Sequence, residues 1–165
     1  MPGKVVSIDS EKVQVWINEV TRALGDSSWL MSDIGHYLIY SILKRTSEGK
    51  DAEGVNFKKY SPEYKKLREL IDLPTDHADL FFGGSMLSAL TFEEDEISVK
   101  LFFMDTPHVE HTTIPGRKRS KSKTTNAELA FYNDETRPFF AISVKEQENI
   151  FNMVNDFIEN ALKGK

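Results

Sequence analysis

The sequence predicts an α+β fold in which a small, mainly antiparallel sheet is packed by N-terminal and C-terminal amphipathic helices. Apolar residues recur at helical spacing near both ends of the chain, and they occupy alternate positions from 97 to 103, as in a strand with one buried face. The chain has 165 residues, of which 39% are hydrophobic, enough for one core. We therefore expect residues 1–165 to form a single domain.

Three helices are predicted in the first half of the chain. Amphipathic patterns over 10–24 and 33–46 predict two helices that share a core. A shorter helix is predicted over 61–71, where Ser61 suits the N-cap and Pro62 suits the first helical turn.

The middle of the chain predicts a β-hairpin followed by a long loop. The hairpin follows a turn at 81–85, and its second strand is expected over 97–103. The apolar pattern lapses from 106 to 125, which predicts a long exposed loop. The acidic residues at the predicted hairpin tip are Glu93, Glu94, Asp95 and Glu96.

The last third of the chain predicts a corner before a terminal helix. Residues 127–133 suit either an extended segment or a short helix. Pro138 favours extended backbone at Arg137, so the apolar segment from 136 to 142 is interpreted as a strand edge. Ser143 and Glu146 then have the spacing of a capping box, and apolar residues continue at helical spacing to Ile158.

Charge is distributed unevenly along the chain. The net charge is −5, yet the 106–125 loop contains five cations and no anion between 117 and 123, so the rest of the chain is strongly acidic. An acidic body argues against broad coating of nucleic acid, whereas the loop could contact phosphate or the acidic tip of a neighbouring copy. The cations are Arg117, Lys118, Arg119, Lys121 and Lys123.

Composition excludes several kinds of chemistry. The absence of cysteine excludes disulfides, thiolate metal sites and a cysteine nucleophile. No apolar run is long enough to span a membrane, and the N-terminus lacks the apolar core of a signal peptide. We expect a soluble protein made in the cytoplasm, with no membrane partner.

Histidines and carboxylates lie near one another in two stretches, but their spacing does not suit a metal or acid–base site. No helical pair of histidines flanks a glutamate, and no glycine-rich loop is followed by lysine. We expect no catalytic residues, no cofactor-binding residues and no metal ligands. The residues considered are Asp76, His77, Asp79, His108, Glu110 and His111.

Several short motifs occur in a characteristic order. A helix ends near Lys44-Arg45, a turn-rich loop spans 51–64, a Phe-Gly-Gly-Ser-Met-Leu turn spans 82–87, and Arg-Pro-Phe-Phe-Ala-Ile-Ser at 137–143 precedes the last helix. This order resembles the phage virion morphogenesis family, the tail completion and head-tail joining proteins of tailed bacteriophages. Many members carry a glycine before the final Arg-Pro-Phe, which residues 127–134 lack.

The resemblance implies a structural virion protein without enzymatic activity or cofactor. It implies a homo-oligomeric ring, by analogy a hexamer, at the head-proximal end of a phage tail. Its partners would be tail tube or head connector proteins, with double-stranded DNA passing without sequence-specific binding. Assembly would take place in the host cytoplasm. The corner residues Arg137, Pro138, Phe139 and Phe140 would pack structurally, and the 106–125 loop would contact a neighbour.

Three alternatives stay open at this point. The chain could be a tail terminator or a neck adaptor, which have similar α+β ring-forming folds. It could also be a small nucleic-acid-binding module that uses the basic loop, in which case its affinity should fall steeply with salt. The third is a hydrolase built on the histidine and carboxylate residues, which would need a metal or a base with a perturbed pKa.

Overall fold

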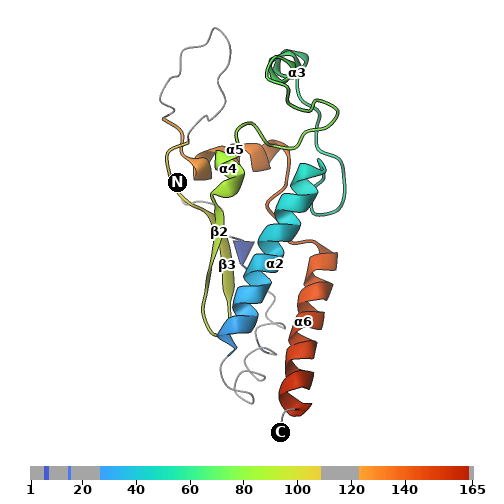
Figure 1. Ribbon diagram of the computed structural model, residues 1–165, viewed down its shortest axis with the longest axis vertical. Coiled ribbons are helices and arrows are strands. Elements are labelled where there is room, and N and C mark those ends of the chain that lie inside the picture. Colours follow the sequence, from blue (N-terminus) through green and yellow to red (C-terminus); the bar gives the residue numbers. More distant parts are fainter. Residues whose placement is uncertain (1–5, 8–14, 16–26, 109–122, 164–165) are drawn as a thin grey trace.

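A computed structural model describes residues 6–7, 15, 27–108 and 123–163. Helices and an antiparallel sheet confirm the predicted α+β class (Figure 1). The helix predicted over 10–24 and most of the 106–125 loop lie outside the described residues. The elements, in order, are β1 Val6–Ser7, α2 Ser28–Ser47, α3 Pro62–Glu69, α4 Ser85–Ser88, β2 Leu90–Glu94, β3 Val99–Phe103, α5 Asn126–Thr136 and α6 Val144–Lys163.

The sheet has the strand order β1-β3-β2, with both pairs antiparallel. The hairpin register pairs Leu90 with Phe103 at one end and Glu94 with Val99 at the other. Val99, Leu101 and Phe103 are all buried, which confirms the predicted alternation from 99 to 103, whereas Ile97, the first residue of the predicted strand, lies before β3 and is 36% exposed. The sheet therefore presents one apolar face to the helices.

Helix α2 packs directly against this face. Gly35 makes the close approach possible, because a Cβ atom there would lie 2.5 Å from the ring of Phe92 on β2. The helix begins at Ser28, earlier than predicted, since Leu30 and Met31 extend its buried stripe toward the N-terminus. The hydroxyl of Ser27 donates to the Glu96 carbonyl over 2.5 Å, so the start of α2 is fixed to the hairpin turn.

Helix α6 packs against α2, which lies between α6 and the sheet (Figure 1). Its buried residues Ile150, Val154 and Phe157 belong to the same core as the sheet residues. The predicted capping box is confirmed: Glu146 N–H donates to Ser143 Oγ at 3.1 Å, and Ser143 N–H donates to the Glu146 carboxylate at 2.7 Å.

For the last third of the chain, the structure selects one of two predicted forms and corrects one expectation. Of the two forms considered for 127–133, the structure has the helix, which is α5, and it starts in a capping box between Thr125 and Glu128. The apolar segment between α5 and α6 is not a strand. Its amides at Phe139 and Phe140 donate to Asp134 Oδ1 over 3.0 and 2.8 Å. A carboxylate therefore accepts the hydrogen bonds that the backbone of a neighbouring strand would accept in a sheet.

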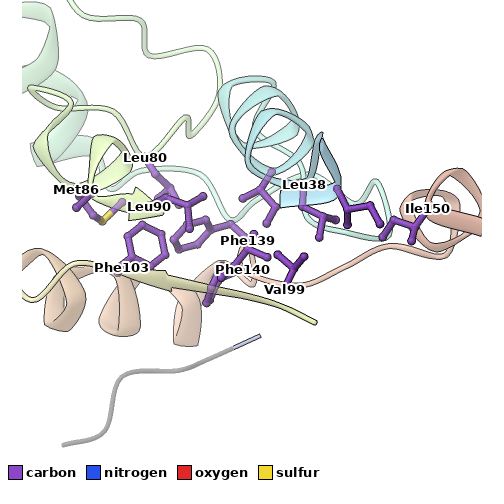
Figure 2. Packing of buried hydrophobic residues seen from close by; sticks show 14 of the residues in the cluster. Leu38, Leu80, Met86, Leu90, Val99, Phe103, Phe139, Phe140 and Ile150 are labelled. Carbon is purple, nitrogen blue, oxygen red and sulfur yellow. The ribbon is translucent and has the colours of Figure 1, made fainter. Parts of the chain in front are cut away.

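The corner between α5 and α6 lies in the centre of the core. Phe139 is 0% exposed and Phe140 is 2% exposed, and both rings make edge contacts with Phe103 of β3 (Figure 2). Figure 2 places this aromatic group between the strands and α2. The packing role predicted for the corner phenylalanines agrees with this position.

Candidate functional site

Arg137 joins the corner to the turn-rich loop that precedes α3. Its Nε donates to the Lys58 carbonyl at 2.7 Å, and its Nη2 donates to the Lys59 carbonyl at 3.4 Å. The guanidinium also lies over the ring of Tyr60, 5.1 Å from the ring centre. Two segments that are almost eighty residues apart in the chain are thus fixed together by one side chain.

Arg68, on α3, lies over the same tyrosine ring at 4.7 Å. Its side chain is completely buried and forms an ion pair with Asp79 at 2.9 Å. The remaining donors are used by backbone carbonyls, at 2.7 Å for Pro74 and 2.6 Å for Phe81. Arg68 therefore fixes α3 to the irregular segment at 74–81.

The hydroxyl of Tyr60 belongs to the same network. It donates to Asp79 Oδ1 at 3.1 Å and accepts from the Leu80 amide at 2.9 Å. Burial, together with the nearby Asp79 carboxylate, raises the pKa of Tyr60 to about 12. The phenol is therefore neutral at physiological pH and serves as a hydrogen-bonding bridge.

A cavity of about 480 Å³ opens between α3, α4, α5 and the 80–84 turn. Its size falls within the range of small-ligand and side-chain pockets. The wall combines aromatic and aliphatic side chains with the polar side chains of Ser61, Ser85 and Asn133, and a histidine and an arginine supply its basic groups. Residues that line it include Tyr64, Phe82, Leu87, Leu129, His108 and Arg137.

Ser85, His108 and Asn126 form a polar cluster beside the cavity. His108 Nδ1 is 2.8 Å from Ser85 Oγ and 3.0 Å from Asn126 Oδ1, and Ser85 Oγ donates to the same amide oxygen at 3.2 Å. Because an amide oxygen only accepts, the contact with Asn126 is a hydrogen bond in the tautomer that carries a proton on Nδ1 of His108. In that tautomer Nδ1 donates and does not accept the Ser85 proton.

This cluster fixes the two ends of the 106–125 loop. The His108 amide donates to the Thr124 carbonyl at 3.1 Å, and the Asn126 amide donates to the Thr106 carbonyl at 2.8 Å. The base of the loop is thus a short antiparallel bridge. Of the five predicted contact cations, only Lys123 lies within the described residues, where it is exposed, whereas Arg117, Lys118, Arg119 and Lys121 lie outside them.

Arg45 provides a second junction, at the C-terminal end of α2. Nη1 pairs with the Glu146 carboxylate, and Nη2 donates to the carbonyls of Phe139, at 3.0 Å, and Ala141. Burial lowers the pKa of Arg45, and the Glu146 charge opposes that shift. Glu146 was predicted only as a capping residue, and its long-range pairing was not visible in the sequence.

The predicted acidic contact residues are brought together at the end of the hairpin. Glu93 and Glu94 end β2, Asp95 and Glu96 lie in the turn, and all four are exposed. The Asp95 carboxylate accepts from the Ile97 amide at 2.9 Å and the Ser98 hydroxyl at 2.7 Å. These bonds lower the pKa of Asp95 and hold the turn in one shape.

The histidine and carboxylate residues considered for metal binding do not converge in the described part of the chain. No group of three or more potential ligands is found there, and Asp79 is occupied by Arg68. Glu110 and His111 lie outside the described residues. His77 bonds instead to Asp76 and to the Ser47 carbonyl, both at 2.8 Å.

Comparisons of the chain with protein-family models, with curated proteins and with solved structures find no match. Among the helices of the described residues, none combines the length and apolar character needed to cross a bilayer.

Proposed function

We propose that this protein is a structural virion subunit of a tailed bacteriophage, which completes the tail or joins it to the head. In this role copies form a ring at the head-proximal end of the tail and contact tail tube or head connector proteins. The DNA duplex passes through the ring without sequence-specific binding. The role is mechanical and requires no cofactor or catalytic step.

The observation that carries the proposal is the convergence of the motifs that resemble this phage family. Arg45, at the end of α2, contacts the 139–141 corner, and Arg137 contacts Lys58 and Lys59 in the turn-rich loop. Tyr64, the last residue of that motif, packs against Phe82 of the glycine turn, with 5.9 Å between the two ring centres. Motifs spread over a hundred residues therefore contact one another and form one structural unit. This is expected if the motifs together maintain the fold of the subunit.

The character of the described surface supports an assembly role. Several large apolar side chains are exposed, including Leu70, just after α3, at 69% and Tyr132, on α5, at 56%. The hairpin tip offers a compact group of carboxylates at a separate position. Protein interfaces usually have an apolar centre and a polar or charged rim.

The test uses purified full-length protein and phage tails assembled without it. Light scattering across protein and salt concentration, with negative-stain imaging, measures the mass and shape of the free protein. A second sample contains the protein mixed with the deficient tails. We expect closed rings of uniform copy number, or binding at one end of each tail that restores joining to heads.

A different outcome of the same experiment would overturn the proposal. A protein that stays monomeric at all concentrations, ignores the tails and binds duplex DNA with an affinity that falls steeply with salt would overturn the proposal. That outcome would favour a nucleic-acid-binding module based on the basic loop. A ring that stops tube polymerisation would instead assign the tail terminator role.

A further inference from the structure

The cavity between α3, α4 and α5 has positively charged surroundings. Among the described residues that line it, none carries a carboxylate, whereas His108 and Arg137 supply basic groups. The nearest buried acid, Asp79, is neutralised by its ion pair with Arg68. Lys58 and Lys59 are exposed immediately before Tyr60, which adds positive charge beside the cavity. An apolar group accompanied by carboxylates fits these surroundings.

Arg137 is already held in position to receive such a carboxylate. Its bonds to the Lys58 and Lys59 carbonyls use Nε and one N–H of Nη2, and the Tyr60 ring supports the guanidinium plane. Guanidinium groups bind carboxylates with the donors that remain. Because the side chain is preorganised, little conformational entropy is lost when a carboxylate binds.

The hairpin tip has the complementary composition. Glu93, Glu94 and Glu96 are exposed carboxylates, and Ile97 beside them is 36% exposed. The turn is also rigid, because Asp95 bonds to residues on its far side and Ser27 donates to the Glu96 carbonyl. An apolar side chain surrounded by acids is thus presented on a fixed support.

The tip cannot reach the cavity of its own chain. Strand β2 leads away from α4 toward the tip, and five residues of strand extend roughly 17 Å. Figure 1 shows the tip and the group of α3, α4 and α5 at opposite ends of the hairpin. A contact between these two surfaces must therefore join two molecules.

We infer that the cavity binds the hairpin tip of a second copy of this chain, with Ile97 entering the cavity and Glu94 or Glu96 pairing with Arg137. The contact is heterologous, so repetition generates a closed ring or an open filament. This inference rests on the proposed self-association and specifies the surfaces that produce it.

The first test is charge reversal at the tip with the double variant Glu94→Lys/Glu96→Lys. Both residues are exposed, so the fold should be retained, which circular dichroism checks. We expect at least a tenfold weaker self-association by sedimentation velocity. Glu148→Lys/Glu159→Lys is the matched control, because both acids are exposed on α6, which neither carries the tip nor lines the cavity, and association should stay at the wild-type level.

The second test observes the cavity directly by methyl NMR. The tip variant carries labelled leucine methyl groups and an intact cavity, and it is titrated with unlabelled wild-type protein, which supplies the tip. We expect shifts at Leu87 and Leu129, which line the cavity. Addition of unlabelled tip variant should leave both signals unchanged.

The outcomes separate the two proposals. Wild-type protein that assembles, together with a tip variant that assembles equally well, would overturn this inference and leave the phage role intact. Association that is lost in the tip variant without methyl shifts in the cavity would also overturn it, because the tip would then bind elsewhere. Wild-type protein that never self-associates would overturn this inference, whereas the phage role is overturned only if that protein also ignores the deficient tails.

Discussion

A fully buried arginine and a partly buried one organise two regions of this molecule in different ways. Arg68 fixes a local region, since its ion-pair partner Asp79 is only eleven residues away in the chain and all three guanidinium nitrogens have partners. Arg45 joins distant segments, because Glu146 lies 101 residues away. The Nε of Arg45 is buried without a hydrogen-bond partner among the described residues. One network is complete and local, whereas the other is incomplete and long-range.

The difference shows how each region depends on its charges. The Arg68 guanidinium has no solvent to replace a lost partner, because its side chain is 0% exposed, while its partner Asp79 is 11% exposed. The Arg45 pair retains slight access to water, at 12% and 7% exposure, and Glu146 also serves as a helix cap. We therefore expect removal of one partner to cost more stability at Arg68 than at Arg45.

The largest effect is expected for Asp79→Asn. This isosteric change leaves the Arg68 charge buried without its counter-ion, so the free energy of unfolding should fall by about 3–5 kcal/mol. Urea unfolding followed by circular dichroism measures the loss. A second variant, Arg68→Met/Asp79→Leu, removes both charges and should recover part of the loss, because no unpaired charge then remains.

The control for this prediction is Glu69→Gln, which neutralises an exposed acid next to Arg68 and should change stability by less than about 0.5 kcal/mol. Equal losses in Asp79→Asn and Glu69→Gln would show that the buried pair does not hold the local region.

A smaller effect is expected for Glu146→Gln. Glutamine can keep the capping box with Ser143, so the change isolates the ion pair with Arg45. The loss should be about 2 kcal/mol, the value of a hydrogen bond to a charged group. Glu148→Gln on the same helix, where the side chain is exposed, is the matched control. A Glu146→Gln loss larger than that of Asp79→Asn would reverse the comparison between the regions.

Features that depend on neighbouring residues could be predicted from the sequence. Ser61 caps α3, accepting from the Tyr64 amide at 3.2 Å, and Ser143 with Glu146 caps α6. The alternation on β3 was also visible, since strand burial repeats every two residues. Helix caps and strand alternation depend only on residues close together in the chain, so they can be predicted without knowledge of the fold.

Features that depend on distant residues could not be predicted. Nothing in the sequence indicated that Asp134 would bind the amides of Phe139 and Phe140, so the corner was interpreted as a strand edge. The partners of Arg45 and Arg68 were missed for the same reason. The cavity was missed too, because α3, α4 and α5 meet only in three dimensions. The acidic tip, in contrast, was visible as a run of adjacent charges.

The smallest effect concerns His77, which links the two regions. Its Nε2 faces the carbonyl of Ser47, two residues after Arg45, and its Nδ1 faces the carboxylate of Asp76 in the segment that carries Asp79. Carbonyl and carboxylate oxygens only accept, so both bonds form together only when the ring carries two protons. The bond to Asp76 and the bond to Ser47 raise the pKa of His77, while the bond from His77 lowers the pKa of Asp76.

The pH dependence of this link follows from these directions. Because the pKa of His77 is raised, its contribution is complete below its ordinary pKa of 6.5 and is lost as pH rises through the raised value. Because the pKa of Asp76 is lowered, its contribution is complete above its ordinary pKa of 3.8 and is lost as pH falls further. The link is therefore strongest between those two ordinary values.

We expect His77→Gln to lower Tm by at most about 2–4 °C near pH 5.5 and by less near pH 8.5, because a neutral imidazole retains only one of the two bonds. Differential scanning fluorimetry at both pH values measures this difference, with His36→Gln, an exposed histidine on α2, as control. A Tm difference that is equal at both pH values would mean that His77 acts through packing alone. The Arg45 and Arg68 regions would then be joined without a charge between them.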